Sequence, residues 1–180
     1  ADVLLVPTTL ARLIACAEAR QLDLVSGFPR QRTESWGEAL LIPYIQFILL
    51  GFLPFFLAKV SNHPGLAAGC GQLFVARSEA YRACGGHRQL KASFHDGLQL
   101  PRVFRRSGLR TGAIDGSDLA TCRMYHSFSE TWRGLSKNAT EGMATLGNIL
   151  PFTFLLGLGQ VLPAVALAIG LPGTPFWAVA

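Results

Sequence analysis

Charged side chains are scarce in this sequence of 180 residues: they make up 15% of it, against roughly 25% in an ordinary soluble domain. Hydrophobic residues supply 50% of the chain. They collect in two long runs rather than being spread evenly, which indicates contact with a membrane. The formal net charge of +5 would suit an anionic partner such as phospholipid headgroups, a nucleotide diphosphate or nucleic acid, and charge alone does not choose among them.

Cysteine is sparse as well. The chain has four cysteines with no C-x-x-C pair, namely Cys16, Cys70, Cys84 and Cys122. This pattern is typical of reduced cytosolic thiols rather than of disulfides or a zinc site. No signal peptide, internal repeat or low-complexity tract is recognisable. The sequence starts without a methionine and ends inside an apolar stretch, so we expect it to be a fragment of a longer protein.

The second apolar run, residues 144–171, contains no charged residue and predicts a transmembrane helix with a kink at Pro151 or Pro163. A further apolar span is expected to begin at Pro175, so residues 144–180 are predicted to be a membrane region. Basic residues precede this region, and the positive-inside rule then places the preceding part of the chain in the cytoplasm. They are Arg123, Arg133 and Lys137.

The rest of the sequence has the pattern of an α/β domain. Strands are predicted over residues 1–6, 22–26 and 70–76, and helices over residues 8–19, 78–84 and 96–107. Pro101 fits the last helix only within its first turn, because a deeper proline costs ~3 kcal/mol.

Turns and loops are predicted where polar and glycine residues cluster. Residues 27–34 are expected to form a polar loop. Two more strands, 109–114 and 119–125, are expected on either side of a turn at Asp115-Gly116.

Two aspartates and an arginine could carry chemistry at a phosphate-containing substrate. Asp2 begins a strand-like run, Asp96 begins a helix, and Arg133 lies in the Glu130–Gly134 stretch before the membrane region. Transfer of a sugar from a nucleotide diphosphate needs a divalent metal held by hard oxygen ligands. It also needs a carboxylate base and cations that stabilise the leaving diphosphate. These residue types are common on protein surfaces, so their presence alone does not establish such a site.

The order of short motifs is more informative than any single one. Ala1-Asp2-Val3 is followed by Gly69-Cys70-Gly71-Gln72, by Gly85-Gly86-His87 and by His95-Asp96-Gly97, and then by Glu130-Thr131-Trp132-Arg133-Gly134 before the membrane region. This order resembles the family 2 glycosyltransferases. Within that family it is most similar to membrane-bound types that act on lipids, such as the ceramide glucosyltransferase and hopanoid-associated groups.

The resemblance implies a fold and a reaction. Residues 1–140 would be the C-terminal part of a GT-A-like nucleotide-sugar-binding α/β fold, followed by transmembrane helices. The enzyme would transfer a sugar from a nucleotide-sugar donor to a lipid acceptor at the inner face of the plasma membrane, with no role for nucleic acid. It would use Mg²⁺ or Mn²⁺ and would invert the anomeric centre.

The resemblance also implies roles for individual positions. Asp2 matches the end of the family's Asp-x-Asp element and would bind the metal and the diphosphate. Asp96 matches the catalytic base, and His95, which stands where an acidic residue is usual, is expected to bind substrate. The Gly69-Cys70-Gly71-Gln72 loop resembles the acceptor-side loop, so Gly69, Gly71 and Gln72 are expected to bind substrate.

The last motif departs from the family pattern. The family carries Gln/Arg-x-x-Arg-Trp, whereas Trp132 here precedes Arg133. Both are still expected at the floor of the active site, as substrate-binding residues.

The first apolar run, residues 39–58, is interrupted by Pro43, Gly51 and Pro54. If it crossed the membrane, Asp2 and Asp96 would end on opposite sides and could not share a site. The enzyme interpretation therefore predicts an interfacial or re-entrant segment.

Two other functions remain open from the sequence. A multi-span transporter or scaffold without catalysis would use residues 39–58 as a true spanning helix. A processive polysaccharide synthase would be expected to have more membrane spans and an intact Gln-x-x-Arg-Trp element.

Overall fold

The computed structural model divides the chain into two units, Ala1–Leu135 and Ser136–Ala180. A four-stranded mixed sheet forms the centre of the first unit. The structure describes residues 2–90, 95–141 and 147–168. The first unit combines this sheet with helices, so the predicted mixed α/β class is confirmed at this level.

The strand order is β1-β4-β2-β3. Strand β1 (Val3–Leu5) is antiparallel to β4 (Thr111–Cys122), and β3 (Phe74–Ala76) is antiparallel to β2 (Leu24–Gln31). The two central strands, β2 and β4, are parallel. Their carboxyl ends therefore share one edge of the sheet, which is where open α/β sheets usually bind ligands. The beginning of β1 lies at the same edge, because Val3 pairs with Cys122.

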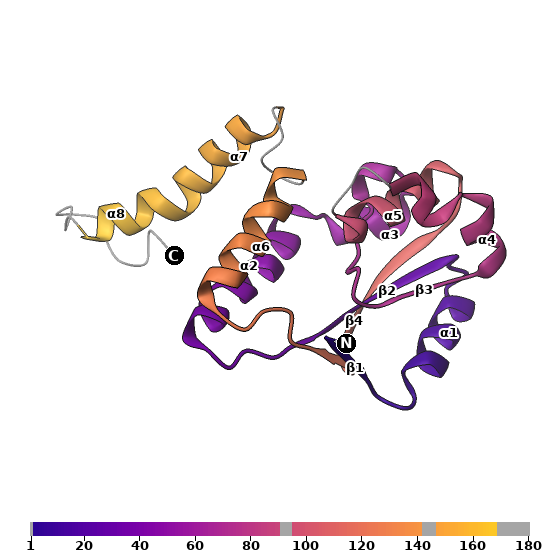
Figure 1. The fold of residues 1–180 in the computed structure, drawn as a ribbon. Coiled ribbons are helices and arrows are strands. Elements are labelled where there is room, and N and C mark those ends of the chain that lie inside the picture. The colour runs from indigo at the N-terminus through magenta and orange to yellow at the C-terminus, as the bar shows by residue number, and fades with distance from the viewer. Residues whose placement is uncertain (1, 91–94, 142–146, 169–180) are drawn as a thin grey trace. The chain divides into compact units, whose positions relative to one another are not determined.

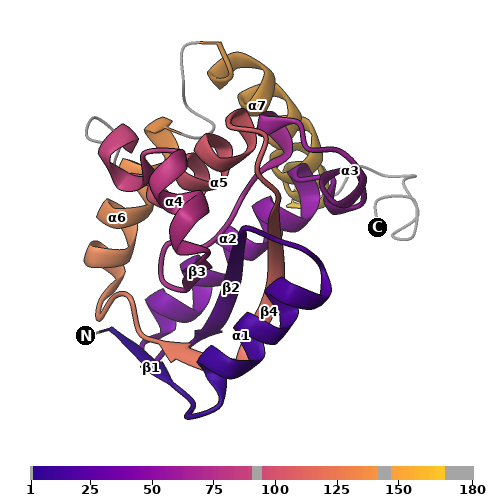
Figure 2. The same cartoon turned by 90° about the vertical axis from the view of Figure 1, so that its right-hand side faces the viewer.

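Helices cover both faces of the sheet, as Figures 1 and 2 show. Helix α1 (Thr9–Ala19) packs on one face, while α4 (Ser78–Ala83) and α5 (Asp96–Arg106) pack on the other. Leu24 and Val25 are neighbours on β2 and enter opposite hydrophobic clusters, as strand alternation requires. The α1 cluster contains Leu13, Ala17, Leu22, Val25, Leu73, Leu119 and Ala120. The α5 cluster contains Leu24, Ala80, Cys84, Leu90, Leu100 and Phe104.

The first apolar run forms two helices, α2 (Trp36–Phe52) and α3 (Phe55–Val60), separated at Pro54. Many of their apolar side chains are exposed rather than packed in a core. These are Trp36, Leu40, Tyr44, Phe47, Leu50, Phe56, Leu57 and Val60. The pair is inserted between β2 and β3, and these two strands are hydrogen-bonded to each other.

The later helices are α6 (Phe128–Glu141), α7 (Ile149–Leu156) and α8 (Leu162–Ala168), with a π-helical turn at Gly157–Val161 between the last two. Within the described residues, one helix is long and apolar enough to cross a membrane, Ile149–Leu167, with 19 residues. At 1.5 Å per residue it is about 28 Å long. The span expected at Pro175 and the ends of the predicted 144–171 helix lie outside the described residues.

Three local predictions were wrong. Residues 27–34 are not all loop, because β2 continues to Gln31. The predicted turn at Asp115-Gly116 does not divide two strands; β4 passes through it, and the register with β2 shifts between Pro29 and Arg30. A shift of this kind tolerates Pro29 inside a central strand, since proline cannot donate to the ladder.

The third error concerns Pro101. It is the sixth residue of α5, not part of the first turn, and it is fully buried. Burial of this helix against the sheet offsets the local cost of the proline, which shows tertiary packing overriding helix propensity.

Candidate functional site

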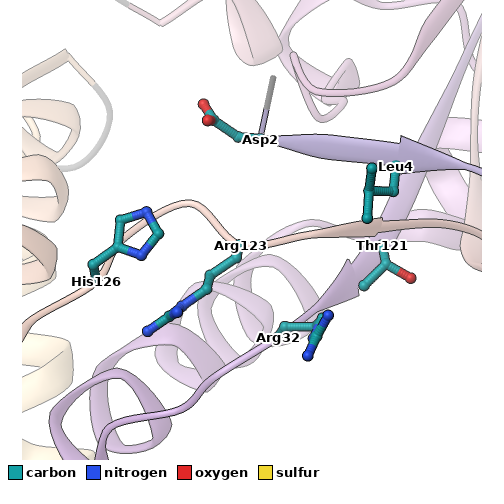
Figure 3. Close-up of a pocket in the computed structure, with 6 residues that line it drawn as sticks. All are labelled: Asp2, Leu4, Arg32, Thr121, Arg123 and His126. Carbon is teal, nitrogen blue, oxygen red and sulfur yellow. The ribbon is translucent and has the colours of Figure 1, made fainter.

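A pocket of about 200 Å³ opens at the carboxyl edge of β2 and β4. Its lining comes from three strands and the segments that extend them, as Figure 3 shows. The lining residues are Asp2, Leu4, Arg32, Thr121, Arg123 and His126. One carboxylate, two guanidinium groups and an imidazole thus surround a small cavity. A site of this composition can bind an anion such as a phosphate.

Sheet pairing explains why these residues meet. Arg32 follows β2 and donates its main-chain N–H to Cys122 O at 2.7 Å, while Arg123 donates its own to Asp2 O at 3.1 Å. Asp2, just before β1, therefore lies at the same edge as Arg32 and Arg123, which follow β2 and β4, although the three residues are far apart in the sequence. Asp2 was predicted as a site residue, whereas Arg32, Arg123 and His126 were not.

Arg123 is held by two carboxylates. Its Nη1 lies 2.6 Å from Glu34 Oε2, and its Nη2 lies 3.2 Å from Glu38 Oε1. The Glu38 side chain is fully buried. Hydrogen bonds from the Glu34 main-chain N–H and the Ser35 hydroxyl, with a further contribution from Arg123, lower the pKa of Glu38 to about 2 against the opposing effect of burial. The Arg123 Nε–H is buried and has no acceptor in the described part of the chain.

A sequence signal for this arrangement exists. Ser35 and Glu38 form an S-x-x-E capping box at the start of α2, in which Glu38 N–H approaches Ser35 Oγ at 3.3 Å. Ser127 and Glu130 repeat the pattern at the start of α6, where Glu130 Oε2 accepts the main-chain N–H of His126 at 2.9 Å. The two boxes fix the segments that carry Arg123 and His126.

Asp96 lies at the start of α5 beside the Gly69–Gln72 loop. A methyl group on Gly71 would lie 2.6 Å from Asp96 Cγ, and one on Gly97 would lie 2.8 Å from Gly69 O. Only glycine allows this close approach of loop and helix. The predicted residues Gly69, Gly71 and Asp96 are therefore brought together, with the Asp96 carboxylate exposed.

Gln72 and His95 complete this second cluster. Gln72 Oε1 accepts a hydrogen bond from Gln31 Nε2 at 2.9 Å, which places the loop near the end of β2. His95 is half-buried and precedes α5, where its carbonyl accepts from the N–H groups of Leu98 and Gln99. His95 thus supports the helix start that presents Asp96.

The Asp2 pocket and the Asp96 cluster adjoin the same central residues. Gln31 pairs with Cys122 on β4, and Cys122 pairs with Val3, next to Asp2. Burial, followed by the charges of Cys70 and Asp2, raises the pKa of Cys122 to about 11. Burial also raises the pKa of Cys70. A hydrogen bond with the Gln72 main chain opposes this rise, and the negative charge of Asp96 adds to it. Both thiols therefore act as neutral groups between the two clusters at neutral pH.

Trp132 and Arg133 do not line the pocket. Trp132 is 57% exposed and stacks on Phe128, with ring centroids 6.2 Å apart, and Phe128 stacks in turn on Trp36 at 6.1 Å. Arg133 is exposed, and its Nε donates to Ser129 O within α6 at 3.3 Å. Among the α6 side chains that the structure describes, Thr131 is buried.

A divalent metal is compatible with the pocket through Asp2. Among the described residues, no group of three His, Cys, Asp or Glu side chains could form a metal cage. Mg²⁺ is often held instead by one or two carboxylates together with substrate phosphates and water. Arg32 and Arg123 are suited to bind the phosphates that would complete such a site, and the buried Nε–H of Arg123 has no acceptor among the described residues.

No family model, curated protein or solved structure matches this chain.

Proposed function

We propose that this chain belongs to a membrane-associated glycosyltransferase of the family 2 type, which transfers a sugar from a nucleotide-diphosphate donor to a lipid acceptor. The observation that carries the proposal is the meeting of Asp2, Arg32 and Arg123 in one pocket at the carboxyl edge of β2 and β4. The cluster formed by Asp96 and the Gly69–Gln72 loop lies next to this pocket.

The residues divide the proposed reaction between them. Asp2 would hold a divalent metal, which supplies positive charge to the leaving diphosphate. Arg32 and Arg123 bind the diphosphate oxygens and stabilise the charge that develops there. Asp96 accepts the proton of the acceptor hydroxyl as that oxygen bonds to the anomeric carbon. A single displacement of this kind inverts the anomeric centre.

Helices α2 and α3 provide the proposed lipid contact. The strands that flank them, β2 and β3, pair in one sheet, so a single crossing of the bilayer between those strands is incompatible with the fold. The exposed apolar surface of α2 and α3 is suited to lie in the membrane interface. We propose that Ile149–Leu167 spans the membrane and that the site faces the cytoplasm at the plasma membrane; the basic residues that precede this helix support that orientation.

The test replaces Asp96 in the full-length protein. Asp96→Asn is expected to lower the rate of sugar transfer to a membrane lipid extract by roughly 10²–10⁴-fold, the usual contribution of a general base. Asp118→Asn is the matched control, because Asp118 is 60% exposed and pairs with Arg12 on the surface. Undiminished transfer by a well-expressed Asp96→Asn protein would contradict the assignment of the base. Absence of transfer by the wild type would favour a scaffold.

A further inference from the structure

Arg105 is a buried cation outside the candidate site. It is 6% exposed and lies near the end of α5. Its guanidinium group makes five hydrogen bonds: Nε donates to Thr111 Oγ1, Nη1 to the carbonyls of Ser61 and His63, and Nη2 to the carbonyls of Ala58 and Thr111. A guanidinium has five N–H donors, so every donor has a partner.

All five acceptors are neutral. Burial lowers the pKa of Arg105, because a charge removed from water costs free energy. A structural cation in a protein core is more often balanced by a carboxylate. Arg105 instead stabilises main-chain carbonyls, and three of them belong to one short stretch, Ala58–His63.

That stretch is the end of α3 and the turn after it. Helix α3 has six residues and none of its side chains is buried, while Phe56 is 76% and Val60 69% exposed. A helix this short is unstable alone, and hydrophobic packing does not stabilise it here. Polar bonds join this stretch to the rest of the unit: those from Arg105 on α5, and one from Asn62 Nδ2, after α3, to Leu109 O, before β4, at 3.1 Å.

The same α5 helix begins with Asp96 and ends at Arg106. We propose that Arg105 is a positioning residue that fixes the exposed apolar helix α3 to α5, and so holds a lipid acceptor in register with Asp96. This proposal rests on the proposed function for the acceptor. The attachment of α3 itself does not depend on it.

The first measurement is amide hydrogen exchange in the full-length protein in lipid nanodiscs. Arg105→Lys keeps the charge but loses the planar fork of donors. Because hydrogen bonds from a charged donor are strong, exchange at residues 55–63 is expected to accelerate roughly tenfold or more, while β2 and β4 stay protected. Thr111→Val is the matched control: it removes one acceptor of Arg105 and leaves the bonds to Ala58, Ser61 and His63.

The second measurement is steady-state transfer. Arg105→Lys is expected to raise the KM for the lipid acceptor by about tenfold while leaving the KM for the nucleotide sugar within about twofold. Thr111→Val is expected to leave both values near wild type even if it lowers the thermal midpoint. Guanidinium ion added to Arg105→Ala is expected to restore part of the acceptor affinity.

The outcomes separate this inference from the proposed function. Unchanged exchange at residues 55–63 in Arg105→Lys overturns the inference, whatever the enzyme does. Faster exchange with an unchanged acceptor KM also overturns it, as does an equal rise of that KM in Thr111→Val. A wild-type protein that transfers no sugar would instead refute the proposed function, and the exchange data would still decide whether Arg105 holds α3.

Discussion

Gly71 and Gly97 show at the residue scale how backbone approach shapes the candidate site. The neighbour of Gly71 is a side-chain carboxylate, that of Asp96, which is exposed and can move. The neighbours of Gly97 are main-chain atoms, Gly69 O at 2.8 Å and Gly71 N at 3.2 Å. The same added methyl group therefore has two different consequences.

Gly71→Ala is expected to displace the Asp96 carboxylate and to reduce sugar transfer by about tenfold or more, with little change in the thermal midpoint. Gly97→Ala is expected to destabilise the fold by about 1–3 kcal/mol, because backbone must shift to admit the methyl group. Calorimetry and a transfer assay on both variants check this. Equal thermal destabilisation by the two substitutions would contradict the distinction.

At the scale of an element, the start of α2 is fixed by a charge network rather than by apolar burial. Glu38 accepts from Glu34 N, Ser35 Oγ and Arg123, so the helix start is bound to the end of β4. Because these groups stabilise the ionised carboxylate, its pKa falls from 4.5 to about 2 in the folded protein. The network therefore contributes stability above the unfolded pKa and loses it as the pH falls from about 4.5 towards 2.

Glu38→Gln is expected to lower the thermal midpoint most at pH 6–7, where wild-type Glu38 is ionised and bonded. The difference from wild type should shrink as the pH falls through that window. Scanning calorimetry in detergent between pH 7 and pH 3 measures it. Glu79→Gln removes the same charge from an exposed helix start on α4 and controls for net charge. A difference that stays constant with pH would mean that Glu38 acts by packing alone.

At the scale of the whole molecule, the decisive feature is the chain order: the apolar helices α2 and α3 come after β2 and before β3, and these two strands pair in one sheet. Residues before and after the two helices must then lie on the same side of a membrane. Single cysteines at Arg20 and at His63, both exposed, would report this in a chain whose native cysteines have been replaced. A membrane-impermeant maleimide is expected to label both positions from the same side. Labelling from opposite sides would contradict the paired sheet and the shared site.

Local pattern predicted much of the element content. The helical spacing of Leu13 and its neighbours identified α1, and flanking glycines identified the ends of α4 and α5. The long uncharged run identified the candidate span, Ile149–Leu167. Each of these features depends on a single segment and the surroundings of its faces. The spacing and length of the apolar residues within that segment are therefore enough to predict it.

The composition of the pocket could not be read in the same way. Asp2 and Asp96 were expected to be site residues, and the Gly69–Gln72 loop was expected beside substrate. Arg32 and Arg123 had been interpreted as a loop residue and a membrane-flanking charge. The S-x-x-E motifs at Ser35–Glu38 and Ser127–Glu130, which hold the segments carrying Arg123 and His126, were the sequence signal that could have identified them.

The sequence by itself determined which segments are apolar, where α1, α4 and α5 begin and end, and that the chain combines an α/β part with a membrane-length helix. Only the tertiary structure decided that β2 reaches Gln31, that β4 is continuous, and that Arg32, Arg123 and His126 meet Asp2. The physical reason is that strand register and close backbone approach are set by contacts between segments that are distant in the sequence. The free energy of those contacts cannot be predicted from either segment alone.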